Sequence, residues 1–166
     1  MSIEGYIRRD VESIIKEQQL DRSRIYEVSK LHYSGIIREI QTRFVDKGGN
    51  IHWSNMGYFN RNLPCRSLSI NGRPLWYHDL DHIIPRPDEP VYVLLEDVKN
   101  YTAKYWLYEM YLPELKLVLD EISGLNDFYI VSRKYEWLIS ENHEDIISLI
   151  GSCLNAESLD INSMGI

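Results

Sequence analysis

The stretch Val91-Tyr92-Val93-Leu94-Leu95 decides the fold class, because it is a run of β-forming residues bounded by Pro90 and by the charged pair Glu96-Asp97. A short apolar run with such borders is typical of a strand buried in a sheet. The next segment rich in β-forming aromatic residues, Lys104–Met110, favours a second strand. Its tyrosines, together with Tyr101, also fit one face of a helix, so a helix remains the alternative for that segment.

The sequence beyond these segments predicts further strands. Phe128–Ser132 and Trp137–Ser140 have the composition of strands. Residues 143–150 fit either a turn into a last strand or the acidic first turn of a helix, and we favour the strand, which Gly151 would end.

Three helices are predicted by apolar residues that recur at three- and four-residue steps. The first covers about residues 3–18. The second has an apolar stripe at Ile36, Ile37, Ile40 and Phe44, with an extension back through Leu31 as an option, and Gly48-Gly49-Asn50 ends it. The third covers about residues 112–123, with Pro113 in its first turn, where the missing N–H costs nothing, and Gly124 after its end.

The region before Val91 contains one strong local signal. Asn71-Gly72 predicts a type I′ hairpin turn between strands at Arg66–Ile70 and Arg73–Tyr77, the second shortened or placed at an edge by Pro74. Residues 50–65 have no clean period and are expected to be mostly loop, with room for a short strand at Ile51–Trp53.

Together these patterns predict an α+β fold. Two N-terminal helices precede a mostly antiparallel mixed sheet, and the helix at about 112–123 packs on that sheet. A chain of 166 residues with 44% hydrophobic and 26% charged residues suits one core, and no linker or repeat divides it. We therefore expect a single domain over residues 1–151 and a loosely held C-terminal tail over 152–166.

Composition also predicts the compartment. No apolar run reaches the roughly 18 residues of a membrane-spanning helix, and the start Met1-Ser2-Ile3-Glu4 lacks an export pattern. We expect a cytoplasmic protein with no membrane partner. Cys65 and Cys153 have no CxxC partner and are expected to be reduced and buried, without a disulfide or a zinc site.

Charge is distributed unevenly along the chain. Residues 1–75 hold twelve basic and eight acidic side chains, a sum of +4, whereas residues 76–166 hold six basic and seventeen acidic side chains, a sum of −11. Summed charge steers encounters without dictating the fold. The second half is therefore expected to repel nucleic acid and to attract a basic protein.

One short run carries a catalytic pattern. Asp81-His82-Ile83-Ile84-Pro85 resembles the Asp-His-Ile-Ile/Val-Pro segment of HNH endonucleases, in which the His activates water and the Asp helps to hold a divalent metal. The resemblance would give Asn100 the role of a later Asn. The Cys pairs common in that family are absent, and the acidic surroundings suit DNA poorly. A metal-dependent nuclease that uses Asp81 and His82 is therefore an alternative, not the function that we expect.

The same region contains a second pattern. His78-Asp79-Leu80-Asp81-His82 places two imidazoles four residues apart, which on a helix could form a transition-metal site. Strand-forming residues before it and proline after it disfavour a helix, so we expect solvation or a local Asp–His hydrogen bond. GxSxG, GxGxxG and GxxxxGK[ST] motifs are also absent. We expect no catalytic, cofactor-binding or metal-binding residues.

A broader pattern covers the second half of the chain. It consists of apolar and aromatic runs with a recurring Trp-Leu and Asn-His, namely Tyr92-Val93-Leu94-Leu95, Tyr105-Trp106-Leu107-Tyr108-Glu109, the helix around Leu115–Ile122, Phe128–Tyr135 and Trp137–His143. In these residues Val91–Gly151 resembles small bacterial proteins, several of which are immunity partners of secreted polymorphic toxins. The resemblance implies a compact α+β domain without catalytic residues that binds its cognate toxin inside the producing cell.

The resemblance gives the charge distribution a specific meaning. A nuclease toxin needs a basic cleft to hold phosphates, and an acidic partner could cover that cleft as a nucleic-acid mimic. The acids that would suit this surface, flanked by Tyr and Trp anchors, are Asp88, Glu89, Glu96, Asp97, Glu141, Glu144 and Asp145. We expect a cognate basic toxin as partner, and not nucleic acid. Another protein-binding or structural role is the further alternative, and the sequence leaves the oligomeric state open.

Overall fold

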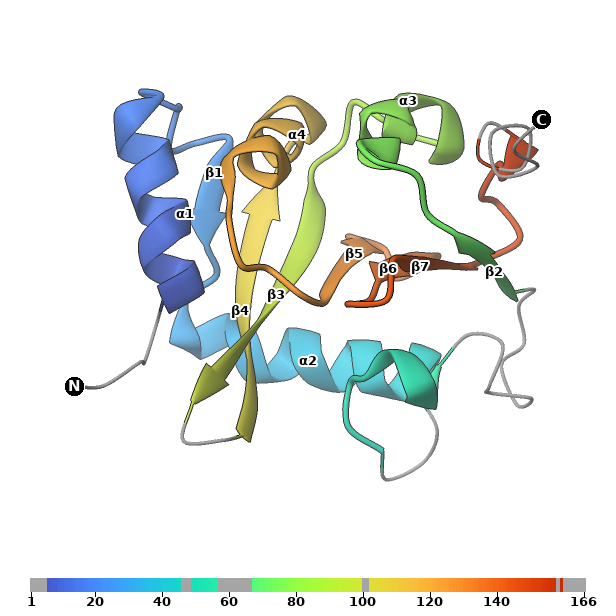
Figure 1. Ribbon diagram of the computed structural model, residues 1–166. Coiled ribbons are helices and arrows are strands. Elements are labelled where there is room, and N and C mark those ends of the chain that lie inside the picture. The colour runs from blue at the N-terminus through green and yellow to red at the C-terminus, as the bar shows by residue number, and fades with distance from the viewer. Residues whose placement is uncertain (1–5, 46–48, 57–66, 100–101, 158, 160–166) are drawn as a thin grey trace.

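The computed structural model describes residues 6–45, 49–56, 67–99, 102–157 and 159 (Figure 1). Within these ranges the α-helices are α1 (Tyr6–Glu17), α2 (Lys30–Phe44), α3 (Leu80–Ile83) and α4 (Leu112–Glu121). The strands are β1 (Ile25–Glu27), β2 (Ser67–Asn71), β3 (Val91–Lys99), β4 (Thr102–Met110), β5 (Phe128–Ser132), β6 (Leu138–Glu141) and β7 (Ile146–Ile150). Short 3₁₀ turns lie at Trp53–Asn55 and Trp76–Asp79.

The strands form one sheet in the order β1-β4-β3-β5-β6-β7-β2. Every neighbouring pair among the described strands is antiparallel. The α+β class and the mostly antiparallel pairing are therefore confirmed, and only the expected mixture with parallel pairs is not found among the described strands. Strands β4 and β3, second and third in this order, form a hairpin paired from Val91↔Met110 to Lys99↔Thr102, which confirms a strand and not a helix at Lys104–Met110.

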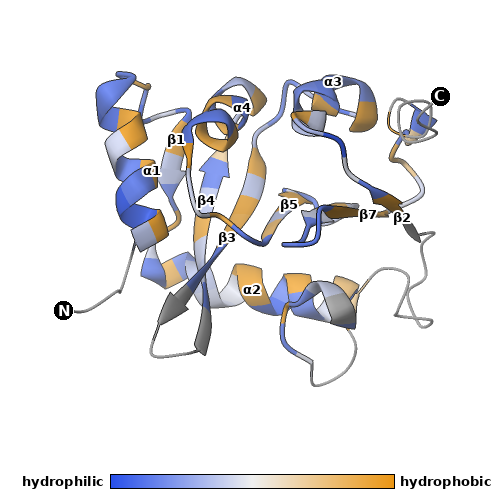
Figure 2. Cartoon of the chain, in the orientation of Figure 1, coloured by the Kyte–Doolittle hydropathy of each residue, from blue (hydrophilic) through white to orange (hydrophobic). Residues whose placement is uncertain are grey.

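The sheet has a hydrophobic core on each face. Val93 and Leu95 of β3 belong to the core that also contains residues of α1, α3 and α4, and Leu94 belongs to the core that contains residues of α2. Figure 1 places α1, α3 and α4 on one side of the sheet and α2 on the other. Figure 2 shows the apolar residues of α2 on the side turned toward the sheet. The helical cover is therefore broader than the single packed helix that the sequence predicted, because alternate β3 side chains need apolar partners on both faces.

The predicted helices and the last strands are largely confirmed. α1 lies inside the predicted 3–18, and α4 begins at Leu112 with Pro113 in its first turn. β5 has the predicted bounds, and residues 146–150 form a strand, as favoured. In the two helices the apolar period specified the element, whereas residues 146–150 fitted a helix as well as the strand that they form.

The predicted Asn71-Gly72 hairpin is wrong. β2 ends at Asn71 and pairs with β7, and the Gly72 N–H donates to the carbonyl of Asp145, 2.6 Å away. Residues 73–77 form no strand: Pro74 has no N–H to donate to a neighbouring strand, and a 3₁₀ turn begins at Trp76, which is only 1% exposed. The short strand at Ile51–Trp53 is also wrong, since a 3₁₀ turn begins at Trp53.

Several expectations concern the cysteines and the tail. Cys65 and Asn100 lie outside the described residues, and Cys153 is exposed, not buried as expected. In the tail, the Asn155 N–H donates to the Ile83 carbonyl at 2.8 Å, and Leu159 is 2% exposed. These tail residues therefore pack against the core beside α3.

Candidate functional site

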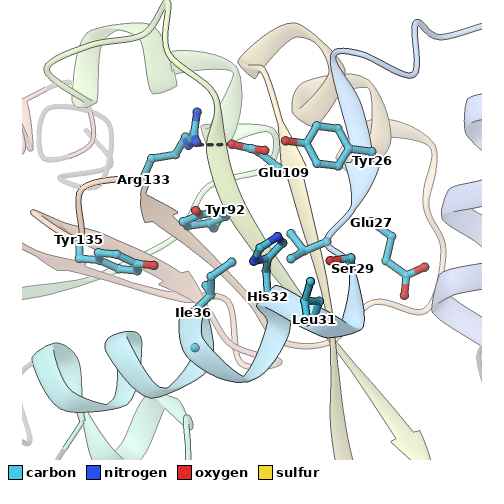
Figure 3. A pocket seen from close by; sticks show the side chains of 12 residues that line it. Tyr26, Glu27, Ser29, Leu31, His32, Ile36, Tyr92, Glu109, Arg133 and Tyr135 are labelled. Carbon is cyan, nitrogen blue, oxygen red and sulfur yellow. Dashed lines mark ion pairs between the residues drawn. The ribbon is translucent and has the colours of Figure 1, made fainter.

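A pocket of about 590 Å³ lies between β1, the start of α2 and the turn that joins β5 to β6 (Figure 3). This volume falls in the range of small-molecule sites. The pocket lies on the face of the sheet that α2 covers, because its lining residues Ile36, Tyr92 and Tyr135 pack against the core on that face. Its lining residues are Tyr26, Glu27, Val28, Ser29, Leu31, His32, Gly35, Ile36, Tyr92, Glu109, Arg133 and Tyr135.

A row of three side chains on adjacent strands contributes to the pocket. Tyr26 of β1 and Tyr92 of β3 are both paired with Glu109 of β4. Side chains directly opposite one another in neighbouring antiparallel strands point to the same face. Glu109 therefore lies between two tyrosines in the row of strands, and the close view in Figure 3 shows its carboxylate between the Arg133 guanidinium and the hydroxyl end of Tyr26.

Glu109 is an unusual residue for this position. It is only 6% exposed, and burial raises the pKa of its carboxyl, an effect that the Arg133 guanidinium opposes. Arg133 Nε lies 2.7 Å from Glu109 Oε1, yet Oε1 accepts no hydrogen bond of acceptable geometry from the described residues. A buried carboxylate oxygen without a hydrogen bond is costly, so Glu109 is a candidate ligand-binding group.

Aromatic rings and an apolar rim complete the pocket. The rings of Tyr92 and Tyr135 stack with centroids 6.0 Å apart. Tyr26 and Leu31 are 41% and 83% exposed, and large apolar surfaces at a rim are typical of binding sites. The pocket therefore combines one buried charge with rings that can enclose a ligand.

A second, smaller hollow of about 280 Å³ lies at the other end of β5 and β6. Leu75 and Trp76 line it from one side, and Glu141 and Asp145 line it from the β6–β7 turn. Leu75 is 54% exposed and has φ of +61°, a left-handed conformation that strains a leucine. Strained, exposed apolar residues are concentrated at functional sites, which makes this hollow a second candidate.

Polar contacts hold the walls of the hollow in place. The indole N–H of Trp76 donates to the carboxylate of Glu141, whose pKa is raised by burial. Arg73, the basic residue in the lining, donates to Asp79. The negative charge of the β6–β7 turn is therefore not neutralised by Arg73.

The structure brings together five of the seven acids that the sequence predicted for a partner surface. Leu95 pairs with Phe128, and Phe128 pairs with Glu141, so the residues that follow Leu95 in β3 lie at the same end of the sheet as the β6–β7 turn. The acids at this end are Glu96, Asp97, Glu141, Glu144 and Asp145. Asp88 and Glu89 lie elsewhere, in the segment before β3, where Glu89 pairs with Arg86.

The five acids differ in exposure. Glu144 and Asp145 are exposed, whereas Asp97 is 9% exposed and accepts hydrogen bonds inside the protein. Burial, and then a hydrogen bond to Asp127, raise the pKa of Glu96 to about 8, so Glu96 carries less negative charge near neutral pH than an ordinary glutamate. The exposed charge at this end of the sheet is therefore concentrated in the β6–β7 turn.

The segment that contains the HNH-like run and the two histidines is largely helical, which was not expected. His78–His82 lies in a 3₁₀ turn followed by α3, so the expectation of no helix is wrong. His78 Nε2 lies 2.7 Å from Asp120 of α4, and Asp81 pairs with Lys116 of the same helix. These contacts join α3 to α4. The described part of the chain contains no group of three metal-ligating side chains.

Comparison with known proteins gives a family without an assigned function. The model of a family of unknown function, DUF6756, matches residues 4–161. The chain belongs to this family. The DUF6756 match spans both candidate sites and all the described strands. Neither a curated protein nor a solved structure matches the chain. Among the residues that the structure describes, no helix has the length and apolar character needed to cross a membrane.

Sequence reasoning did not find the pocket beside α2. Its residues come from β1, α2, β3, β4 and the β5–β6 turn, so no local motif marks it. One signal was present, because Glu109 shares its strand face with Tyr105 and Leu107 of a segment otherwise rich in apolar and aromatic residues. A carboxylate at an inward position of a strand with neighbours on both sides indicates either a buried ion pair or a site.

Proposed function

We propose that this protein is a non-enzymatic immunity protein, or antitoxin, that binds and neutralises a basic toxin in the cytoplasm. The observation that carries the proposal is the β6–β7 turn, where the exposed acids Glu144 and Asp145 lie beside the hollow that contains exposed Leu75. Acidic groups around an apolar anchor suit an interface with a basic protein.

The charges in this turn support the proposal. Neither Glu144 nor Asp145 forms an ion pair with a described residue, whereas the exposed Glu136 and the partly exposed Glu89 both pair with Arg86. An unpaired charge on the rim of an interface steers a partner of opposite sign and increases the association rate. The overall formal charge of −7 acts in the same direction.

The aromatic and apolar residues supply the second part of the interface. Leu75 is exposed on a left-handed backbone, and the indole N–H of the next residue, Trp76, donates to Glu141. An anchor that is already positioned loses little conformational entropy on binding. If the toxin is a nuclease, the acidic turn would occupy the cleft that holds phosphates.

The test uses the protein encoded beside this gene as the partner. Co-expression should rescue cells from that protein, and the two should co-purify. We expect the double variant Glu144→Lys and Asp145→Lys to weaken the complex by about tenfold or more, mainly through slower association. The matched control Asp88→Lys reverses an exposed acid away from the turn and should leave affinity nearly unchanged.

Two outcomes would count against the proposal. The first is a neighbouring product that neither inhibits growth nor binds this protein. The second is a complex that forms with the same rate constants when the turn is reversed in charge, because the acidic turn would then have no part in binding.

A further inference from the structure

The pocket beside α2 is separate from the proposed toxin surface. Tyr92 of the pocket is paired with Val131, near the end of β5, whereas the β6–β7 turn lies beyond Glu141, which is paired with Phe128 at the start of β5. The two sites are therefore at opposite ends of the strand. A function for the pocket does not depend on the toxin interface.

Two buried glutamates that face arginines allow an internal comparison. Glu114 accepts hydrogen bonds from Arg24 at both oxygens, with distances of 2.5 and 3.4 Å. Glu109 faces Arg133 in a similar way, with Nε 2.7 Å from Oε1, but that oxygen accepts no hydrogen bond within the described part of the chain. Glu109 and Arg133 line the pocket beside α2, whereas Glu114 and Arg24 do not line it.

Arg133 is held weakly at this position. Its side chain is 50% exposed and lies in the turn after β5. A half-exposed ion pair without a well-formed hydrogen bond contributes little stability. The arginine can therefore leave the carboxylate when another cation takes its place.

The surroundings of Glu109 favour a cation. Tyr26 and Tyr92 flank the carboxylate on neighbouring strands, and tyrosine rings attract cations through their faces. The other carboxylate in the lining, Glu27, pairs with Arg8, which is not a lining residue. The guanidinium in the lining belongs to Arg133, which faces Glu109. An anion placed here would meet the Glu109 charge in a poorly solvated site.

We propose that this pocket binds a guanidinium or primary ammonium group on a flexible stem, which hydrogen-bonds to Glu109 between Tyr26 and Tyr92 and displaces Arg133. The stem would lie against the stacked rings of Tyr92 and Tyr135 and the rim residue Leu31. Arg133 occupies the cation position when the pocket is empty.

The experiment is a titration of the full chain, followed by amide NMR signals, with two cationic probes and one anionic probe. Agmatine represents a free small molecule, and Nα-acetylargininamide represents an arginine side chain of a protein. Saturable shifts at Gly35 and other pocket residues with either cation support the proposal, and the tighter probe identifies the source. Inorganic phosphate is the anionic probe and should not bind in the pocket.

Two variants should change the affinity in opposite directions. Glu109→Gln removes the charge and should weaken cation binding by about tenfold or more. Arg133→Gln removes the competing cation and should strengthen it severalfold. Glu114→Gln, which alters the satisfied pair outside the pocket, should leave affinity within about twofold, because it changes no lining residue.

If Glu109→Gln fails to fold, the change in cation affinity of Arg133→Gln still tests the proposal. Weaker cation binding in Arg133→Gln, phosphate binding in the pocket, or no saturable shift with either cation would each overturn the proposal. Failure of the toxin-binding test would not affect it, because the probes do not involve the β6–β7 turn.

Discussion

Asp97 in β3 accepts a hydrogen bond from the backbone N–H of Ile7 in the first turn of α1, with 3.2 Å between Oδ2 and N. The same oxygen accepts a hydrogen bond from the indole N–H of Trp106 at 2.9 Å. Asp97 thus joins the first helix to the β3–β4 hairpin across 90 residues of sequence. A negative side chain at a helix N-terminus is favourable both as a hydrogen-bond acceptor and through the helix dipole.

We expect Asp97→Ala to lower the free energy of unfolding by about 2 kcal/mol, because it leaves two donors without this acceptor. Urea denaturation followed by circular dichroism measures the change. The control Asp88→Ala removes an exposed acid and should change stability by less than about 0.5 kcal/mol. Equal stability of the Asp97 variant and the wild type would contradict the structural role.

Glu96 should make stability depend on pH. Its pKa is about 8 in the folded chain, against an ordinary value of 4.5, so the folded state holds a proton that the unfolded state has lost across this range. The free energy of unfolding therefore falls as the pH rises from about 4.5 to about 8. Glu96→Gln imitates the protonated form and should make this fall less steep.

The effect of Glu96→Gln is measured by denaturation at several pH values between these limits. The reduction in slope should be smaller than the roughly 1.4 kcal/mol per pH unit that one full proton gives, since Glu96 is only half-buried. Glu89→Gln is the control at an exposed ion pair and should leave the slope unchanged. A slope unaltered in Glu96→Gln would show that this carboxyl titrates normally.

Gly151 should not tolerate a side chain. Its φ is +134°, and an added Cβ would lie 2.8 Å from Cβ of Trp137 and 3.0 Å from the carbonyl oxygen of Glu136. We expect Gly151→Ala to destabilise the protein by about 1–3 kcal/mol through backbone strain and this close approach.

The matched control is Gly35→Ala in α2, where nothing lies within 4 Å of an added Cβ. That change should stabilise the protein by up to about 1 kcal/mol, because alanine favours a helix. Thermal unfolding of the two variants compares them directly. A neutral Gly151→Ala would mean that the chain relaxes easily at the end of β7.

A substitution at Leu75 should change stability and toxin affinity in opposite directions. Leu75→Gly relieves the left-handed strain and sacrifices little buried surface, since Leu75 is 54% exposed, so stability should rise by about 1 kcal/mol or less. Under the proposed function the same variant should bind the toxin more weakly, because it lacks the apolar anchor. Denaturation and affinity measurements on one preparation test both effects. Tighter or unchanged binding would remove Leu75 from the interface.

Local sequence patterns predicted most of the elements but not the pocket. The β-forming run at Val91, the proline in the first turn of α4 and the apolar period of α1 depend on neighbours in sequence, so the pattern alone identified them. The Asn71-Gly72 signal was equally local, yet it was overruled because β2 finds its partner in β7, with Asn71 opposite Ile146.

What the sequence determined by itself is therefore the α+β class, the three longer helices and most of the strands, together with the concentration of acids in the second half. Tertiary structure alone decided which acids are exposed and which are bound internally, because Asp97 and Glu141 find their partners far along the chain at Ile7 and Trp76. It also placed Glu109 between Tyr26 and Tyr92. The physical reason is that strand pairing joins residues that are distant in sequence, and burial, pKa and access to a ligand depend on those neighbours.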